Sequence, residues 1–362
     1  MTDTSKAGGE AGRRTAAHPR TPKAPPTIYD IAVLAGVNPS TVSRALSKPG
    51  RVSAKTAQKI MEAAEELNYQ VNVFARALPT GRTQTIGLIV SDITNPAYFE
   101  VIRGAETAAS AHGYTLMLAE SAESADLEMT AARRMLATVD GLILASPRLS
   151  DEEIGRLSST KPVVVINRSV AGVTSMVADI EAGVTDAVRH LAAMGHAAIS
   201  YVPGPERSWM SQRRWESIKA RCDWHGIEAT MEAGQQPTVD GGRRAAAAVR
   251  AGRATAVFCY NDLMAIGLMR ELQAAGLAIP EDLSILGFDN IFGSDFTTPP
   301  LSTIKSPLHA LGASALESLL AAGDRAAQLQ DDPALPTELV LRGSTGQARE
   351  GQKMSGNSLA TG

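Results

Sequence analysis

Polar side chains of complementary chemistry follow several short apolar runs of this sequence, at the points where those runs end. Carboxylates accept hydrogen bonds, guanidinium groups donate them in a fixed geometry, and amides do both, so the set suits a ligand with many hydroxyl groups. Each residue taken alone is explained as readily by helix capping or by a loop hydrogen bond. The set comprises Asp92, Asn95, Asn167, Arg168, Arg214, Asn261, Asp262, Asp289 and Asn290.

Aromatic residues near the same segments would supply the apolar walls on which a sugar ring stacks. They are Tyr98, Phe99, Trp209 and Phe296.

Motifs of common catalytic sites do not occur in the sequence. It has no GxSxG turn, no GxxxxGK[ST] loop and no GxGxxG after a predicted strand. The six histidines are not spaced like metal ligands, and Cys222 and Cys259 have the character of reduced packing thiols. We therefore expect no catalytic residue, no metal and no cofactor.

The elements that must position the polar set form an α/β pattern from Thr85 onward. Short Val, Ile and Leu runs alternate with helical spans, which predicts parallel sheets covered on both faces. Ligands of such sheets lie beyond the carboxyl ends of the strands. Two rounds of the pattern predict two doubly wound lobes with a cleft between them. We expect strands within 85–92, 114–121, 141–146, 162–168, 198–205, 255–262 and 283–290, and helices over Tyr98–His112, Leu127–Ala137, Glu181–Met194, Ser211–His225 and Leu263–Ala275.

A different pattern precedes this body. Ile28, Ile31, Ala32 and Ala35 form one apolar helical face, which Gly36 ends, and Thr27 with Asp30 fits a cap. Asn38-Pro39 then fits the start of a second helix, whose apolar residues Val42, Ala45 and Leu46 would pack back on the first. A third helix is expected from Ser53. This arrangement is typical of a helix-turn-helix, although small helical domains without DNA also show it.

The charge is unevenly divided. Residues 1–82 hold 12 Lys and Arg against 6 Asp and Glu, net +6, and the remainder holds 23 against 32, net −9. A basic module on an acidic body is expected where one end of a protein meets nucleic acid. No apolar run is long enough to cross a bilayer, and residues 1–26 lack the apolar core of a signal peptide. We therefore expect a cytoplasmic protein with no membrane partner.

The sequences of several segments resemble those of the lactose/galactose-repressor family of bacterial transcription regulators. YDIAVLAGVNPSTVSRAL resembles its helix-turn-helix, and KPGRVSAKTAQKIMEAAEELNYQVNVFARAL its third helix and hinge. HLAAMGHAAISYVPGP, FCYNDLMAIG, IPEDLSILGFDN and PPLSTIKSP resemble its effector-binding core, which is akin to periplasmic sugar-binding proteins. The resemblance covers residues 27 to about 345.

The resemblance implies that a headpiece helix reads the DNA major groove and that a hinge helix folds in the minor groove. Leu78 matches the leucine that this family wedges between base steps, an act that bends the duplex. An ordinary linker leucine is the alternative, and Pro79 departs from the commonest pattern. The implied DNA-binding residues are Thr27, Tyr29, Asn38, Pro39, Ser40, Thr41, Ser43, Arg44, Asn72, Ala75 and Leu78.

The resemblance also implies roles in effector binding. Asp289, Asn261 and Arg214 match positions that hydrogen-bond the effector, and Asn95 and Arg168 would line the opposite lobe. Trp215 and Glu216 depart from the family pattern, so the effector need not be a simple pentose or hexose, and purine-like ligands fit the same scaffold. The expected effector-binding residues are Asp92, Asn95, Phe99, Asn167, Arg168, Trp209, Arg214, Asn261, Asp289 and Phe296.

These patterns together predict a repressor that binds a palindromic operator in double-stranded DNA as a homodimer, under control of a small, sugar-like effector. A sugar receptor of the periplasmic kind is the alternative, which the basic headpiece disfavours. The expected organisation is a disordered tail over 1–26, a headpiece over 27–71, a hinge over 72–82, a first lobe over 83–178 plus 306–336, a second lobe over 179–305 plus 337–345, and a disordered tail over 346–362.

Overall fold

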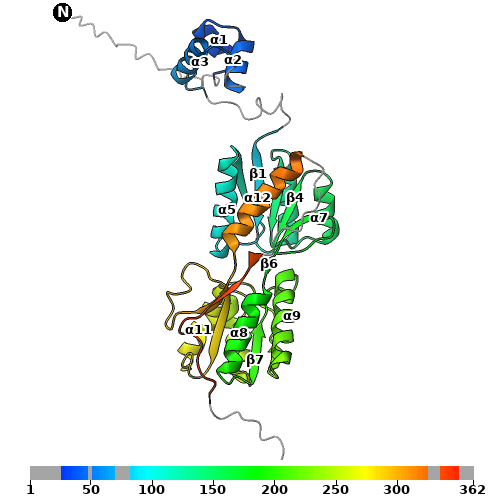
Figure 1. The fold of residues 1–362 in the computed structure, drawn as a ribbon, viewed down its shortest axis with the longest axis vertical. Coiled ribbons are helices and arrows are strands. Elements are labelled where there is room, and N and C mark those ends of the chain that lie inside the picture. Colours follow the sequence, from blue (N-terminus) through cyan, green and yellow to red (C-terminus); the bar gives the residue numbers. More distant parts are fainter. Residues whose placement is uncertain (1–25, 48–50, 70–81, 325–334, 350–362) are drawn as a thin grey trace, which may run out of the picture. The chain divides into compact units, whose positions relative to one another are not determined.

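The computed structural model describes residues 26–47, 51–69, 82–324 and 335–349, which are coloured in Figure 1. The chain divides into two compact units, one up to Gly81 and one from Arg82. We call them the headpiece and the core and describe each by itself. The predicted N-terminal tail up to residue 25 and the hinge residues Asn72, Ala75 and Leu78 lie outside the described residues.

The described part of the headpiece contains helices α1 (Ile28–Ala35), α2 (Pro39–Ser47) and α3 (Ala54–Glu66). The carboxylate of Asp30 accepts hydrogen bonds from the backbone N–H and the hydroxyl of Thr27, which fixes the start of α1. Gly36 ends α1 with φ +66°, a conformation that favours glycine. Ser53 caps α3 by accepting from the Thr56 N–H.

A small apolar cluster joins the three helices. Ile31 on α1, Val42 on α2 and Ile60 on α3 are completely buried against one another. Ile31 and Val42 belong to the apolar faces expected from the sequence. The packing leaves the polar face of α2 outward, as a helix-turn-helix requires.

The first lobe of the core contains a parallel sheet of five strands in the order β2-β1-β3-β4-β5. Helices cover both faces of this sheet (Figure 1). The strands are β1 (Thr85–Val90), β2 (Thr115–Glu120), β3 (Gly141–Ala145), β4 (Val163–Ile166) and β5 (Thr174–Met176), and the helices are α5 (Ala97–Ala111), α6 (Ala125–Leu136), α7 (Asp151–Ser158) and α12 (Leu308–Asp324).

Alternation along the strands explains why both faces are covered. Ile86 and Leu88 of β1 pack in the cluster that contains α5 and α12 residues. Ile89 packs on the opposite side, in the cluster with residues of α6 and α7. Successive side chains of a strand point to opposite faces, so a continuous apolar run buries both.

Helix α12 belongs to this lobe although it follows a strand of the other lobe. It lies along α5, and each helix has a glycine at the crossing. A Cβ on Gly104 would meet the His309 carbonyl oxygen at 2.0 Å, and one on Gly312 would meet the Val101 carbonyl oxygen at 2.1 Å. The close approach of the two backbones therefore needs both glycines.

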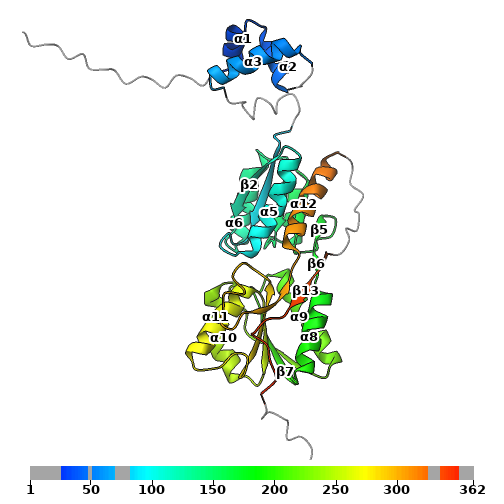
Figure 2. The ribbon, with the colours of Figure 1, turned by 60° about the vertical axis from the view of Figure 1, so that its left-hand side comes forward.

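The second lobe contains a six-stranded sheet in the order β13-β11-β10-β9-β7-β8, parallel except for the pairing of β13 with β11. Helices α8 and α9 cover one face, and α10 and α11 cover the other (Figure 2). The elements are α8 (Glu181–Ala193), β7 (Ala198–Val202), α9 (Trp209–Trp224), β8 (Glu228–Met231), α10 (Val239–Ala251), β9 (Ala256–Cys259), α11 (Asp262–Ala274), β10 (Ser284–Asp289), β11 (Ser302–Lys305) and β13 (Glu338–Val340).

Short strands mark the connections between the lobes. Strand β6 (Ala178–Asp179) pairs in parallel with β12 (Leu335–Pro336). Thr337 continues from β12, and its hydroxyl donates to the Asp179 carbonyl oxygen. The described chain also extends past residue 345, because the Ala348 N–H donates to the Met194 carbonyl oxygen of the second lobe.

The architecture confirms the expected fold class, with three headpiece helices and two doubly wound sheets. Helices α10 and α12 and strands β5, β6, β8, β11, β12 and β13 were not among the predicted elements. Helix α10 buries the small residues Gly241, Gly242, Ala245 and Ala246, and its two glycines, which have low helix propensity, weaken the local signal for a helix. The predicted domain boundaries stay predictions, and the contact of Ala348 differs from the tail expected from residue 346.

Candidate functional site

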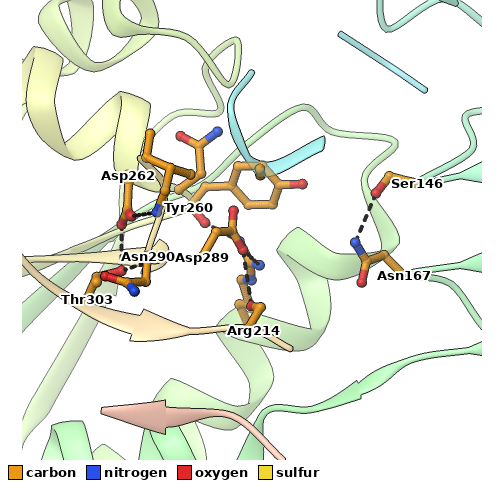
Figure 3. A network of polar contacts seen from close by, with 12 residues as sticks. Ser146, Asn167, Arg214, Tyr260, Asp262, Asp289, Asn290 and Thr303 are labelled. Atoms are coloured by element: carbon orange, nitrogen blue, oxygen red, sulfur yellow. Dashed lines mark hydrogen bonds and ion pairs between the residues drawn. The ribbon is translucent and has the colours of Figure 1, made fainter. Parts of the chain in front are cut away.

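An ion pair between α9 and β10 lies at the strand ends of the second lobe. Arg214 Nη2 donates to Asp289 Oδ1 at 2.8 Å, and both side chains are almost fully buried. Arg214 Nη1 donates to the Tyr260 carbonyl oxygen, and Ser306 donates to the same Asp289 oxygen. Asp289 adopts φ +101°, a strained conformation for a residue with a side chain, and such strain is concentrated at functional sites. Figure 3 shows this pair.

The surroundings of Arg214 keep it charged. Burial alone would lower the pKa of Arg214, but the Asp289 carboxylate and the neighbouring phenols raise it above its ordinary value. The guanidinium carbon also lies 4.3 Å from the ring centre of Phe288 and 4.9 Å from that of Tyr260. Arg214 Nε is buried without a hydrogen-bond partner, so the arginine retains one unused donor.

Asp262 stabilises the strand ends of the second lobe that carry Asp289 and Tyr260. Its side chain is completely buried and accepts from Thr303 Oγ1 at 2.6 Å, Ser294 Oγ at 2.7 Å and the Ile291 N–H at 2.9 Å. Burial raises the pKa of Asp262 to about 7, and the nearby Asp289 adds to the rise. The carboxyl group therefore ties the start of α11 to β11 and to the loop after β10 (Figure 3).

The strand ends of the first lobe supply the opposing edge. Ser146 follows β3 and Asn167 follows β4, and both have positive φ. Asn167 Nδ2 donates to Ser146 Oγ at 3.3 Å. The buried Tyr98 hydroxyl bonds to Ser91 Oγ, next to the end of β1, and burial raises the pKa of Tyr98.

A second buried ion pair stands at the same edge, and the sequence analysis missed it. Arg148 Nη2 lies 2.6 Å from Glu123 Oε2, and Arg148 Nη1 donates to the Ser146 carbonyl oxygen. Burial lowers the pKa of Arg148, but Tyr260 and Glu123 more than reverse this and raise it. Arg148 and Glu123 follow strand ends as the predicted residues do, and this position was the available signal.

The two edges face each other across the lobes. Tyr260 of the second lobe influences the pKa of Tyr98 and that of Arg148 in the first, which requires all three to be near one another. In Figure 3 the Tyr260 hydroxyl points toward Ser146 and Asn167. Ile291, from the loop after β10, also packs into the apolar cluster of the first lobe.

Three of the predicted effector-binding residues hold the backbone in place. Asn261 Oδ1 accepts from the Met264 N–H at the start of α11, and its Nδ2 donates to the Pro237 carbonyl oxygen. Asn95 Oδ1 accepts from the Ala97 N–H at the start of α5. Asp92 accepts from the backbone and the hydroxyl of Thr94. Their predicted contact with an effector stays a prediction.

Arg168 is held by the loop after β3 and by the first residue of α7. Its Nη2 pairs with Asp151 Oδ1 at 2.6 Å, and its Nη1 donates to the Leu149 carbonyl oxygen. Arg168 Nε is buried without a partner. The structure therefore places Arg168 beside Asn167 with most of its donors already engaged.

The predicted aromatic residues divide into two groups. Trp209 is half-buried against the core cluster of the second lobe, and Tyr98 lies at the facing edge. Phe99 is 44% exposed, and Phe296 is 69% exposed and meets only the ring of Phe292 among the aromatic contacts of the described residues. Tyr260, which the sequence analysis did not single out, is the aromatic ring beside Arg214.

Helix α2 presents a polar face on the headpiece. Ser40, Ser43 and Arg44 are exposed, and Thr41 is half-buried. The first turn of α2 starts at the Asn38 carbonyl oxygen, which accepts from the Thr41 and Val42 N–H groups. Tyr29 on α1 is also 66% exposed. Hydroxyl and guanidinium groups on one exposed helix suit contacts with base edges and phosphates.

Other site chemistry is absent from the described part of the chain. Within it, no group of three or more His, Cys, Asp and Glu side chains is placed to hold a metal ion. Cys222 and Cys259 are free and buried, and burial raises the pKa of Cys222 to about 12. No helix among the described residues is long and apolar enough to cross a membrane.

Both the headpiece and the core match known protein families. Residues 27–72 match the model of bacterial regulatory proteins of the lacI family, and residues 188–345 match a periplasmic binding protein-like domain. The HTH-type transcriptional repressor PurR of Vibrio vulnificus is 35% identical over 308 residues, which cover 81% of this chain and 91% of the repressor. The chain belongs to the lacI family. It is a DNA-binding transcription regulator, as the headpiece predicted, and not an enzyme.

Solved structures of lacI-family regulators resemble the structure of this chain. The lac repressor dimer bound to operator and the anti-inducer ONPF superimposes with a TM-score of 0.80 at 28% identity, covering 89% of this chain and 99% of that one. A LacI family regulator from Enterococcus faecium with bound ribose has a TM-score of 0.65 at 30% identity, covering 73% of this chain and 100% of that one. The alternative of a receptor without DNA function leaves the match of the headpiece unexplained.

Proposed function

We propose that this lacI-family regulator is a repressor that binds a palindromic operator as a homodimer, in the cytoplasm, and that an effector bound between the two lobes controls its grip on DNA. The observation that carries the proposal is the buried Arg214–Asp289 pair opposite Ser146 and Asn167. Buried, strained polar groups on facing edges are pre-arranged for a ligand.

Hydrogen-bonding capacity at the two edges suits a ligand with hydroxyl groups. Both hydrogen bonds to Asp289 end on Oδ1, and Oδ2 has no partner among the described residues. The Tyr260 ring supplies an apolar surface beside the Arg214 guanidinium. Asn167 and Ser146 supply donors and acceptors from the other lobe. A sugar or a nucleoside meets these requirements, and ribose is bound by the Enterococcus faecium relative.

Contacts with DNA are assigned to α2. Ser40 and Arg44 are exposed and would read base edges, while Thr41 and Ser43 would hold phosphates and set the register. The lac repressor binds its operator as a dimer. The two-fold symmetry of such a dimer requires an operator with matching half-sites.

A gel shift with DNA from upstream of the protein's own gene tests the DNA part of this proposal. We expect retardation of a fragment that contains a palindrome, at about 50 mM salt, and loss of retardation in an Arg44→Ala variant. Lys59→Ala is the matched control, because it removes one exposed positive charge from α3. Failure of the wild type to retard any palindrome at low salt would refute the proposal.

A thermal-shift panel of sugars, polyols, nucleosides and purines tests the effector part. We expect at least one compound to stabilise the core and to change the operator affinity of the same preparation. A compound that binds only one lobe and leaves operator affinity unchanged would contradict the assignment.

A further inference from the structure

The pairing of charged side chains at the two facing edges indicates which net charge a ligand of this site can carry. Arg214 is paired with Asp289 and Arg148 with Glu123, each within hydrogen-bonding distance. The neighbouring Arg168 is paired with Asp151. These three guanidinium groups therefore each already have a carboxylate partner.

Because the Arg148–Glu123 pair is buried, separating its two charges is costly. The Arg148 side chain is 4% exposed and that of Glu123 is 14% exposed, so neither charge is well solvated. The backbone fixes the pair further, because the Arg148 and Leu149 N–H groups donate to the buried carboxyl group of Glu128. Arg148 cannot swing out to meet an anion without leaving Glu123 unpaired in a buried position.

We propose that the Arg148–Glu123 pair makes the effector site selective for uncharged ligands, and that Glu123 is the residue that excludes phosphorylated ones. This inference rests on the proposed effector site. A phosphate monoester carries a charge of about −1.5 to −2 at neutral pH. In this site it would lose water and meet the carboxylates of Glu123 and Asp289, while Arg148, Arg168 and Arg214 are already paired with carboxylates. We expect this to weaken binding at least about 100-fold.

One further guanidinium lies nearby and limits the design of the test. Arg342 donates to Asn290 Oδ1 and to the Leu301 carbonyl oxygen, and it has no carboxylate partner among the described residues. If Arg342 served as a phosphate site, the wild-type protein itself would bind phosphate. The test therefore starts with the wild type.

Inorganic phosphate is the probe, because it requires no knowledge of the effector. Melting temperature is measured against phosphate concentration at constant ionic strength for the wild type, Glu123→Gln and Asp186→Asn. The Asp186→Asn control removes the same charge from an exposed pair with Arg189 on α8. We expect a saturable rise for Glu123→Gln alone, because its Arg148 lacks a carboxylate. If Glu123→Gln is unfolded without phosphate, we expect phosphate to restore its fold.

A double variant separates charge from shape. Adding Arg148→Gln to Glu123→Gln removes the unpaired cation, so the response to phosphate should disappear. A saturable response of the wild type, or no response and no refolding of Glu123→Gln, would overturn the inference. A failed gel shift would refute the proposed DNA function instead, and the phosphate titration does not depend on it.

Ligand pairs give the same answer on the native protein. Ribose against ribose 5-phosphate and cytidine against its 5′-monophosphate are compared by calorimetry. The phosphorylated member of any pair that binds should bind at least about 100-fold more weakly, and Glu123→Gln should narrow that ratio. Equal affinity of both members for the wild type would contradict the role of Glu123.

Discussion

Replacing Asp262 by asparagine isolates the contribution of one buried carboxyl group to the pH dependence of stability. The pKa of Asp262 is raised from 3.8 to about 7, first by burial. Below about pH 3 the carboxyl group is protonated in both the folded and the unfolded state, so its full contribution to stability is present. As pH rises toward 7 the unfolded chain releases this proton while the folded chain keeps it, so stability falls and the loss is complete once the folded group ionises.

The magnitude follows from the size of the shift. A rise of about three pKa units corresponds to about 4 kcal/mol, lost at up to about 1.4 kcal/mol per pH unit between roughly pH 4.5 and 6.5. Asparagine has no proton to lose, and its amide keeps one acceptor for the Ile291 N–H and one donor for the Thr303 hydroxyl. Relative to the wild type, Asp262→Asn should therefore become progressively more stable as pH rises.

Urea unfolding followed by tryptophan fluorescence measures this directly. All three tryptophans, Trp209, Trp215 and Trp224, lie on α9 in the second lobe, which also contains Asp262. Asp186→Asn, which changes an exposed carboxylate, is the control. Stability profiles of Asp262→Asn and wild type that stay parallel from pH 4.5 to 6.5 would refute the reasoning.

The remaining predictions concern the contact between the lobes and the step on DNA. Ile291→Ala should lower the free energy of unfolding, measured in urea, by about 2–4 kcal/mol, because it leaves a cavity in the apolar cluster of the first lobe. Phe292→Ala, at the neighbouring residue that is 77% exposed, should change the free energy of unfolding by less than about 0.5 kcal/mol. Equal effects of the two substitutions would place Ile291 outside that cluster. Leu78→Ala should weaken operator binding more than nonspecific binding in gel shifts if Leu78 is the predicted wedge between base steps, because a wedge makes no phosphate contact. Equal losses would contradict the predicted hinge role. Operator affinity should fall about 10³–10⁵-fold between roughly 50 and 200 mM salt, and a flat salt response would argue against several phosphate contacts.

Local patterns made much of the fold predictable from sequence. Apolar spacing, Gly36 and the Asn38-Pro39 start defined the helix-turn-helix, and the structure has the same helices. Strand ends located the site because the carboxyl ends of parallel strands meet at one edge. Asp289 and Asn167 were found in this way, and the structure gives both a positive φ.

Long-range pairing was the part that sequence patterns did not predict. Glu123 follows β2 and Arg148 follows β3, and the two side chains form an ion pair. The sequence of either segment alone does not indicate this partner. Conversely, Asn261 follows a strand as expected, yet its side chain caps α11. A local pattern shows that a polar residue stands near the edge, and only the packed structure shows which atoms remain unused.

Operator affinity measured with and without a ligand tests the central claim most directly, namely that filling the site between the lobes changes the grip on DNA. The ligand is the compound that most stabilises the wild type in the thermal panel, and the proteins are the wild type, Arg214→Ala and Arg213→Ala. Arg213 is the half-buried neighbour of Arg214 on α9 and pairs with Glu181 and Glu216. The account predicts that the ligand shifts the operator affinity of the wild type and of Arg213→Ala but not that of Arg214→Ala, which still binds operator. An unchanged ligand response in Arg214→Ala, or a wild type whose operator affinity no stabilising ligand alters, would contradict it.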